Sequence, residues 1–333
     1  MKHAPMPVQF SIIQAGKLRR YKHFRFVDYI TTPGIFLKNS FDIIKTIWGT
    51  IQSIWLIIRF RPDVVFAKGG FVCLPVGFAA RLLRTPLVIH DSDARPGLTN
   101  RLLAPYAKVI ATGYPLENYS YNSKKSVYTG VPVRTNYQKT RPEQVKKYKQ
   151  ELGFDSTRLL VVAMGGGLGA KSINQAITHA APDLIKDKVQ LLLLSGVSHY
   201  EQVNNVAQRY APDIQVVDFV SDGMGAVLGA ADVVVTRASA TTLQELAVLA
   251  KPIIAVPSRA LADQHKNAEV YEKANAAIVL TDDQLESGDL VSVLKDVLVD
   301  KHLRQKLGVA IHALARPHAA RDVALLIIDS AKR

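Results

Sequence analysis

The chain has 333 residues, of which 48% are hydrophobic, and because this length exceeds the size at which one core usually keeps growing, we expect two domains. The formal charge of +14 is uneven, since residues 1–150 carry 24 Lys and Arg against 7 Asp and Glu, whereas residues 151–333 carry 18 against 21. The single cysteine, Cys73, excludes an internal disulfide and a multi-cysteine metal site, and it indicates a reducing, cytoplasmic compartment.

The basic first half predicts a polyanionic partner, either nucleic acid, anionic lipid headgroups or a diphosphate substrate. Charge alone does not choose among these three. We expect no nucleic acid, because the sequence contains no helix-turn-helix, zinc-knuckle or RNA-recognition pattern and its basic residues are scattered through predicted αβ units.

The first 60 residues predict little sheet structure. Phe10 to Gln14 is a possible strand, and Met1 to Gln14 lacks the long apolar run of a signal peptide. Phe41 to Phe60 is mostly apolar, but Asp42 and other polar residues interrupt it before the roughly 18 clean apolar residues that a membrane span requires. Its apolar positions recur at helical spacing, and they are Ile43, Ile44, Ile47, Trp48, Ile51, Ile54, Trp55 and Ile58. We expect a helix that faces the core of the first domain, and the alternative is that its apolar, aromatic face also touches lipid.

From residue 62 onward, short apolar runs alternate with helical patterns, which is typical of parallel α/β sheets. The strands expected in a first sheet are Asp63 to Ala67, Leu87 to His90, Val109 to Thr112 and Ser126 to Thr129. The polar stretch from Val131 to Asp155 predicts a linker with a short helix. The strands expected in a second sheet are Leu159 to Met164, Gln190 to Leu194, Ile214 to Val217, Val233 to Thr236, Ile253 to Val256 and Ala277 to Leu280. Helices follow from about Leu290 to the end. Two such domains would place the carboxyl ends of their strands across a shared cleft.

Two glycine-rich turns follow predicted strands. Gly165 to Ala170 precedes a helix that begins near Lys171 to Asn174, so its backbone and the helix N-terminus could hold a diphosphate. The turn is neither a Walker A loop nor a complete GxGxxG pattern, and the alternative is a merely tight turn. Lys68 to Phe71 forms a similar but weaker pattern in the first domain.

Polar residues cluster where one predicted strand ends. His90, Asp91, Ser92 and Asp93 follow one another there, and Pro96 to Asn100 comes next. A loop at this end of a strand fits a catalytic or acceptor site, in which Asp91 could act as a base towards a hydroxyl. The alternative is that Asp91 and Asp93 are loop and helix-cap residues. A Mg²⁺ site is less favoured, because nothing fixes the number of ligands.

The segment from Val233 to Asn267 combines a buried strand, a hydroxyl-rich helix start, a second strand and an Asp-Gln-x-x-Asn run. Ser239 to Thr242 lead into the helical pattern, which places Glu245 in the first turn. Unpaired N–H groups at a helix start attract phosphates, and a carboxylate one turn in can accept a pair of ribose hydroxyls. The segment therefore predicts one side of a nucleotide-sugar pocket, and the alternative is an ordinary capped helix after a core strand.

Five stretches of the chain also carry a family resemblance. They are Arg61 to Val65 with Gly69 to Val72, Pro86 to His90 with Pro96 to Asn100, Thr129 to Arg134, Gly165 to Asn174, and Phe219 to Asn267. In this order they resemble the bacterial UDP-N-acetylglucosamine:N-acetylmuramyl-(pentapeptide) pyrophosphoryl-undecaprenol N-acetylglucosaminyltransferases, which make lipid II for peptidoglycan.

The resemblance implies an α/β chain with the GT-B fold, in which two Rossmann-like doubly wound domains face a cleft. We expect residues 1–134 to form an acceptor- and membrane-facing domain that is N-terminally incomplete, with a linker at 135–155. Residues 156–304 would form the UDP-sugar-binding domain, and residues 305–333 a helix that returns to the first domain.

The resemblance also implies an inverting transfer of GlcNAc from UDP-GlcNAc to the muramoyl 4-hydroxyl of lipid I. In the family, the equivalent of Glu245 accepts the ribose hydroxyls, Gln264 contacts the sugar, and Phe219 is one of the residues that bracket the uracil. The donor-binding residues it implies are Arg134, Gly166, Gly167, Gly169, Phe219, Val220, Met224, Ala240, Thr241, Thr242, Leu243, Gln244, Glu245, Gln264 and Asn267. The acceptor-binding residues are Gly69, Gly70, Asp93 and Asn100, and the catalytic candidates are Asp91 and His90.

The chain departs from the family pattern at several positions. Gly167 and Leu168 replace a usual Ser-Gln, so backbone donors alone would bind phosphate. Asp91-Ser92-Asp93 replaces Glu-Gln-Asn, and Val131 replaces an Asn. The Gly-Gly-Thr-Gly-Gly-His loop of the family, which contributes to acceptor binding and catalysis, is absent from this sequence.

We expect no metal or other cofactor, and we expect UDP-GlcNAc, lipid I and an anionic membrane surface as partners. The expected location is the cytoplasmic face of the cell membrane, as a peripheral protein. Two alternatives stay open: a GT-B transferase for another lipid acceptor such as diacylglycerol, and a catalytically degenerate UDP-sugar-binding membrane protein.

Overall fold

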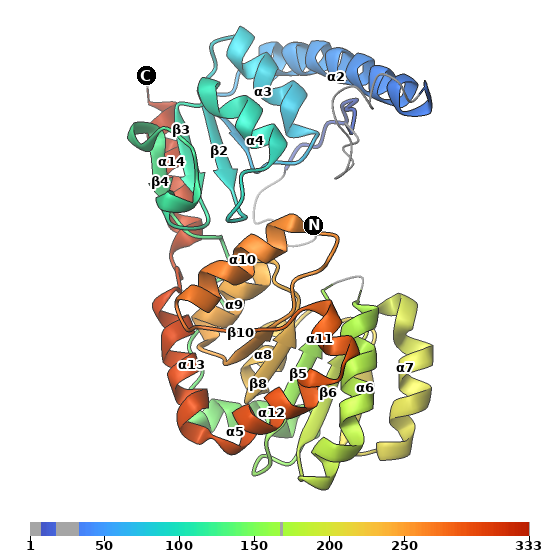
Figure 1. Ribbon diagram of the computed structural model, residues 1–333. Coiled ribbons are helices and arrows are strands. Elements are labelled where there is room, and N and C mark those ends of the chain that lie inside the picture. Colours follow the sequence, from blue (N-terminus) through green and yellow to red (C-terminus); the bar gives the residue numbers. More distant parts are fainter. Residues whose placement is uncertain (1–7, 18–32, 167–168, 333) are drawn as a thin grey trace.

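The computed structural model describes residues 8–17, 33–166 and 169–332, and it places them in two α/β domains (Figure 1). Each domain is built on a sheet whose paired strands are all parallel. The arrow of β2 in the first domain points towards α10 in the second (Figure 1). The predicted fold class, two doubly wound α/β domains that face each other, is confirmed.

The first domain contains a four-stranded sheet in the order β1-β2-β3-β4. Its strands are β1 (Val65–Ala67), β2 (Leu87–Asp91), β3 (Val109–Thr112) and β4 (Ser126–Tyr128). Its helices are α2 (Pro33–Phe60), α3 (Cys73–Leu82) and α4 (Leu98–Leu103), with short 3₁₀ turns at Ala104–Tyr106, Leu116–Asn118 and Ser123–Lys125. The core between these elements is apolar and includes Leu87, Ile89, Leu103 and Ile110.

The second domain contains a six-stranded sheet in the order β10-β9-β8-β5-β6-β7. Its strands are β5 (Leu160–Met164), β6 (Gln190–Leu194), β7 (Ile214–Val217), β8 (Val233–Thr236), β9 (Ile253–Ala255) and β10 (Ile278–Val279). Its helices are α5 (Pro142–Glu151), α6 (Lys171–Lys186), α7 (Tyr200–Ala207), α8 (Met224–Ala230), α9 (Ala240–Leu249), α10 (Ala262–Lys273), α11 (Asp282–Glu286), α12 (Asp289–Val299) and α13 (Lys301–Ala313), with 3₁₀ turns at Val197–His199 and Gln208–Tyr210. The chain steps outward from β5 to β7 and then returns to β8 on the other side, so the loops after β5 and β8 open at a switch point of the kind where ligands bind.

All ten strands predicted for the two sheets are present, and their bounds differ from the prediction by at most two residues. Strands β2, β5, β6 and β8 are buried at every position. Parallel strands covered on both faces consist of continuous apolar runs, and this made them recognisable in the sequence.

The predicted strand at Phe10 to Gln14 is wrong. Residues 8–17 contain no strand, and they run beside α2 instead of extending the sheet. The backbone N–H of Gln14 donates to Gln52 Oε1 at 2.8 Å, and that of Gly16 donates to Thr46 Oγ1 at 3.3 Å. Side chains of α2 therefore satisfy donors that a strand would have paired with β1.

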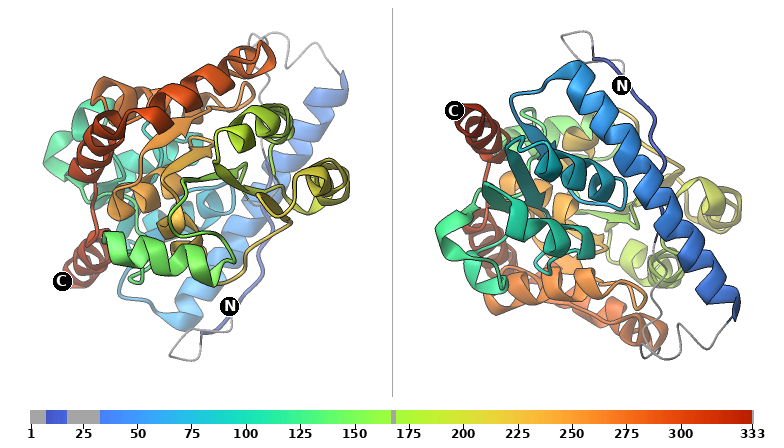
Figure 2. Two further views of the ribbon diagram at one scale, coloured as in Figure 1. Left: turned by 90° about the horizontal axis from the view of Figure 1, so that it is seen from below. Right: turned by 90° about the horizontal axis from the view of Figure 1, so that it is seen from above.

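The prediction that the helix at Phe41 to Phe60 faces the core holds for one side of the helix, where Ile57 and Ile54 join the core of the first domain. Helix α2 packs on α3 along a narrow stripe that includes Ser53 and Ile57, and it lies at the edge of the molecule (Figure 2). Apolar side chains cover its outer surface and are about half exposed or more; they are Leu37, Phe41, Ile43, Ile44, Ile47, Trp48, Ile51, Trp55, Ile58 and Phe60. By length and composition, Phe36–Phe60 is the one helix among the described residues that meets the criteria for a membrane span.

Two chain crossings join the domains, one after β4 and one between α13 and α14 (Ala319–Ala331). Helix α13 packs on α9, whereas α14 packs beside β2 and β3, and Lys108 Nζ donates to the carbonyl of Ser330 at 3.1 Å. The crossings touch where Gly130 meets Arg316: Gly130 has a φ of +87°, and a Cβ there would lie 2.3 Å from the Arg316 Cβ. The Arg316 guanidinium lies over the Tyr128 ring at 4.4 Å. The domain bounds given above stay a prediction.

Helix α5, in the predicted linker, is held to the second sheet by a buried ion pair. Lys149 Nζ donates to Asp232 Oδ2 and to the carbonyl of Arg158, both at 2.6 Å. The same Oδ2 accepts from the N–H of Leu160 at 2.8 Å. Because the side chain of Lys149 is only 4% exposed, losing it leaves the Asp232 carboxylate without its counter-charge.

We expect Lys149→Ala to lower the free energy of unfolding by about 3 kcal/mol, since removing one partner of a buried pair leaves an uncompensated charge. Lys147→Ala is the matched control, because Lys147 lies on the exposed side of the same helix, 3.7 Å from Glu151. It should change stability by less than about 0.5 kcal/mol. Denaturant unfolding of the whole chain measures both, and equal losses would show that the buried pair contributes nothing particular.

Candidate active site

A cavity of about 470 Å³ opens between the domains at the carboxyl end of β2. The structure brings all four predicted acceptor residues and Asp91 to its wall, together with residues that the sequence did not single out. The wall of the cavity includes Lys68, Gly69, Gly70, Asp91, Asp93, Asn100 and, from the second domain, Asp263.

Asp91 is the last residue of β2, and its carboxylate faces this cavity although it is only 4% exposed. Its Oδ2 accepts from the Tyr121 hydroxyl at 2.7 Å and from the N–H of Gly97 at 3.2 Å. Burial raises the pKa of Asp91 to about 6, against the hydrogen bonds from Tyr121, Asn100 and Gly97, which lower it. A carboxylate with this pKa is charged at neutral pH and still basic enough to accept a proton.

His90 has a different position from the one expected of a catalytic residue. It is fully buried, its Nε2 lies 3.0 Å from the carbonyl of Gly130, and its Nδ1 lies 3.3 Å from Ser92 Oγ. Burial lowers the pKa of His90 to about 4, so the ring is neutral. Since both ring nitrogens have protein partners and the ring is absent from the cavity wall, only Asp91 of the two candidates is placed to act as a base.

Asn267, at the middle of α10, joins the two domains. Its Oδ1 accepts from the N–H of Ala94 at 2.8 Å, and its Nδ2 donates to Asp93 Oδ1 at 2.9 Å and to the carbonyl of Ala238 at 3.1 Å. The residue is fully buried. Its amide therefore has protein partners in both domains, and the donor-binding role of Asn267 stays a prediction.

The conformation of the turn after β5 requires its glycines. Gly169 has a φ of +76° and approaches the next loop so closely that a Cβ would lie 2.1 Å from the carbonyl oxygen of Ser195. Gly166 is exposed, with a φ of +85° and open space where a side chain would point. Gly167 and Leu168 lie outside the described residues. Helix α6 begins at Lys171, as predicted, and no side chain caps its N-terminus, so its first N–H groups are available to an anion.

Helix α9 begins at Ala240, with the Ser239 hydroxyl accepting from the N–H of Thr242. Glu245 is the sixth residue of the helix, so it lies in the second turn instead of the first. Its carboxylate is hydrogen-bonded to Tyr137 and lies near the positive charge of Arg134. Burial raises the pKa of Glu245, while these two neighbours lower it. Glu245 and Arg134, which are 111 positions apart in the printed sequence, thus belong to one cluster.

The other predicted donor residues differ in exposure. Phe219 is 54% exposed, and Val220 and Met224 are partly buried against the core. Of the first residues of α9, Thr241 is exposed, whereas Ala240, Thr242, Leu243 and Gln244 are buried. The Gln244 Nε2 atom has no hydrogen-bond partner. Gln264 is held by a bond from the N–H of Ser258 to its Oε1 at 2.9 Å.

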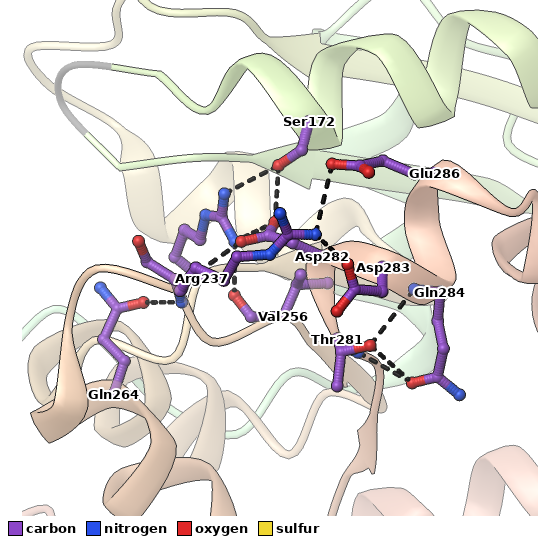
Figure 3. Close-up of polar contacts among 11 residues, drawn as sticks. Ser172, Arg237, Val256, Gln264, Thr281, Asp282, Asp283, Gln284 and Glu286 are labelled. Carbon is purple, nitrogen blue, oxygen red and sulfur yellow. Dashed lines mark hydrogen bonds and ion pairs between the residues drawn. The ribbon is translucent and has the colours of Figure 1, made fainter.

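Sequence reasoning missed several residues of the site. The Tyr121 hydroxyl donates to Asp91, and Tyr137 is hydrogen-bonded to Glu245. Arg237 donates to both Ser172 and Asp282 (Figure 3). Nothing in the spacing of the two tyrosines indicated their partners. Arg237 could have been noticed as a charge directly after a buried strand. No group of three His, Cys, Asp or Glu side chains that could hold a metal occurs within residues 8–17, 33–166 and 169–332.

Two family models match the chain, one in each domain. The glycosyltransferase family 28 N-terminal domain matches residues 3–112, and the glycosyltransferase family 28 C-terminal domain matches residues 160–315.

Curated relatives match across both domains. A protein of Listeria welshimeri serovar 6b named UDP-N-acetylglucosamine–N-acetylmuramyl-(pentapeptide) pyrophosphoryl-undecaprenol N-acetylglucosamine transferase is 33% identical over 300 residues, which cover 89% of this chain and 82% of that protein. A protein of the same name from Caldicellulosiruptor saccharolyticus is 32% identical over 308 residues, with the same two coverages.

Solved structures show the same fold. MurG of Acinetobacter baumannii superposes with a TM-score of 0.72 at 24% identity, over 86% of this chain and 79% of that one. S. aureus MnaA in a co-structure with UDP gives a TM-score of 0.60 at 16% identity, over 84% and 79%.

Proposed function

The chain belongs to glycosyltransferase family 28, and from this premise we propose that it transfers GlcNAc from UDP-GlcNAc to the muramoyl 4-hydroxyl of lipid I. Relatives that are about one third identical over both domains carry the name of this activity. The observation that carries the proposal is a buried, basic carboxylate, Asp91, on the wall of a cavity that also receives Asp263 of the second domain.

The second domain holds the donor in this proposal. The N-termini of α6 and α9 supply N–H groups and the positive ends of two helix dipoles for the diphosphate. Glu245 accepts the two ribose hydroxyls, Gln264 contacts the sugar, and Phe219 packs on the uracil with Val220 and Met224. Arg134, beside Glu245 at the domain junction, adds an exposed positive charge.

Asp91 is the base in the proposed transfer. It accepts the proton of the muramoyl 4-hydroxyl while that oxygen forms a bond to C1 of GlcNAc, and the bond from C1 to the diphosphate oxygen breaks with inversion. UDP leaves with the electron pair, and its charge is stabilised by the helix N-termini and Arg134. The lipid I diphosphate lies along Gly69 and Gly70, near Lys68, and Asp93 and Asn100 complete the acceptor wall. The proposed step uses no metal ion.

We expect Glu245→Ala to weaken UDP-GlcNAc binding by about tenfold or more, because two hydrogen bonds to a charged group are lost. Gln264→Ala should weaken it as well. Isothermal titration calorimetry measures both, with Glu272→Ala, an exposed position on α10, as the control. A UDP analogue without the ribose hydroxyls should bind wild type and Glu245→Ala alike. Unchanged titrations for both site variants would contradict the donor assignment.

Turnover should depend on the protonation of Asp91. With labelled UDP-GlcNAc and a lipid I analogue, we expect the rate to fall as the pH drops through about 6, and Asp91→Asn to lose about a hundredfold or more. The Tyr121 hydrogen bond lowers the pKa of Asp91, so Tyr121→Phe should raise it and move the acidic limb of the pH–rate profile to higher pH.

Tyr106→Phe is the control for this experiment, because Tyr106 is exposed on the same domain. An acidic limb that stays in place, or that moves to lower pH, in Tyr121→Phe would refute the role of Asp91. Transfer to diacylglycerol in place of lipid I would support the alternative acceptor, and donor binding without any transfer would support a degenerate binding protein.

We also propose that the first domain binds an anionic membrane on its cytoplasmic face through α2. The exposed apolar face of α2 includes Trp48 and Trp55, and aromatic residues of this kind prefer the interface between headgroups and acyl chains. Lys45 lies 5.2 Å from the Phe41 ring and Arg59 lies 5.4 Å from the Trp55 ring, so cations flank the apolar face. Because the Ser53 and Ile57 side is packed on the domain, the helix would lie flat in the interface.

Vesicle co-sedimentation tests this surface. We expect a Trp48→Glu, Trp55→Glu double variant to lose at least about tenfold in affinity for vesicles with anionic lipid, and added salt to weaken wild-type binding. A Val299→Glu, Val309→Glu double variant is the control, because both valines are exposed on the second domain. Equal binding by the two double variants would exclude α2 as the membrane surface.

A further inference from the structure

Three segments of the second domain meet at one arginine: the start of α6, the end of β9 and the start of α11 (Figure 3). Arg237 follows β8 directly, and its Nη1 donates to Asp282 Oδ1 at 2.9 Å and to the carbonyl of Val256 at 3.2 Å. Its Nη2 donates to Ser172 Oγ at 2.8 Å. The Ser172 hydroxyl in turn donates to Asp282 Oδ1 at 2.8 Å, which closes a ring of three side chains.

The ring lies next to several segments of the proposed donor site. Ser172 is the second residue of α6, directly after the glycine turn. Val256 precedes the loop in which the N–H of Ser258 holds Gln264, and the N–H of Arg259 donates to Asp282 Oδ2 at 3.2 Å. Arg237 precedes Ala238, whose carbonyl accepts from Asn267. The ring therefore connects the glycine turn, the Gln264 loop and the domain junction.

The guanidinium of Arg237 is directed at the protein and not at the cleft. Its side chain is 13% exposed and that of Asp282 is 10% exposed. Burial raises the pKa of Asp282, but the hydrogen bonds from Ser172, Arg237 and the N–H of Arg259 outweigh it, and the net pKa is lowered. The carboxylate is thus charged at neutral pH, and removing any partner leaves a buried polar group unsatisfied.

The glycine turn needs such a restraint, because glycines have more conformational freedom than other residues and a binding site must order them. The glycine positions of this turn offer only backbone donors to a phosphate, so these donors move with the backbone of the turn and the start of α6.

We propose that Arg237, Asp282 and Ser172 form a clamp that positions the α6 turn and the Gln264 loop, and that it sets affinity for the diphosphate-sugar half of the donor without affecting the nucleoside half. The inference rests on the proposed function, since it assumes that these loops hold UDP-GlcNAc. The three residues are positioning residues and do not touch the reacting atoms.

Binding of UDP-GlcNAc, UDP and uridine to clamp variants tests the proposal, by calorimetry for the diphosphates and ligand-detected NMR for uridine. Asp282→Asn and Ser172→Ala should weaken UDP-GlcNAc and UDP by about tenfold and leave uridine unchanged within about twofold. Ser172→Thr keeps the hydroxyl and should retain wild-type affinity. Asp283→Asn is the matched control: Asp283 is the next residue, its side chain is 80% exposed, and it pairs with Arg259 on the surface, so its loss should leave the affinity for all three ligands unchanged.

The possible results distinguish a failure of the clamp proposal from a failure of the proposed UDP-GlcNAc site. Equal losses for uridine and UDP would show that the ring merely maintains the fold and would overturn the proposal, as would unchanged UDP binding in both Asp282→Asn and Ser172→Ala. If wild type binds UDP-GlcNAc and the variants match it, only the clamp fails. If wild type binds neither UDP-GlcNAc nor UDP, the donor assignment fails and the clamp with it.

Discussion

The side-chain amide of Asn267 is the contact on which the geometry of the cleft depends. It satisfies Ala94 and Asp93 of the first domain and Ala238 of the second at the same time, in a fully buried position. Asp93 and Ala94 lie two and three residues after the end of β2, and Ala238 lies two residues before the start of α9. One amide group therefore sets the distance between the carboxylate of the first domain and the helix starts of the second. An unsatisfied amide in this place would be costly, so the register of the two domains is strongly specified.

The two key carboxylates share one physical arrangement. Asp91 and Glu245 are both removed from water, which raises the pKa of each, and each is restrained by a tyrosine hydroxyl from a neighbouring loop. A tyrosine donates one hydrogen bond without adding charge, so it orients a carboxylate and leaves it basic. The two arginines have different roles. Arg134 lies near Glu245 and is exposed, whereas the guanidinium of Arg237 is mostly buried and donates to other protein groups.

The sequence was sufficient for the ten strands of the two sheets and for the start of α6, because these depend on local patterns of burial and on backbone conformation. At α2 the helical spacing of Ile47, Ile51 and Trp55 indicated an amphipathic helix, but it did not reveal how little of the apolar side the core covers. The sequence did not predict the contacts of His90 and Asn267, because their partners come from distant parts of the chain. Tyr121, Tyr137 and the Arg237 ring were missed for the same reason, since spacing along a loop does not define contacts between loops.

The contact between Gly130 and Arg316 is the point where the two chain crossings between the domains touch. Both chain crossings pass through this point, and the Tyr128 ring under the Arg316 guanidinium keeps them together. The junction also has an apolar part, in which Tyr114 of the first domain packs edge-on against Tyr271 of the second, with the ring centroids 6.3 Å apart. A side chain at position 130 would collide with Arg316 and force the two crossings apart, and this would also disturb the aromatic pair and the contacts of Asn267. The alignment of the two domains therefore depends on a glycine that lies outside the wall of the cavity.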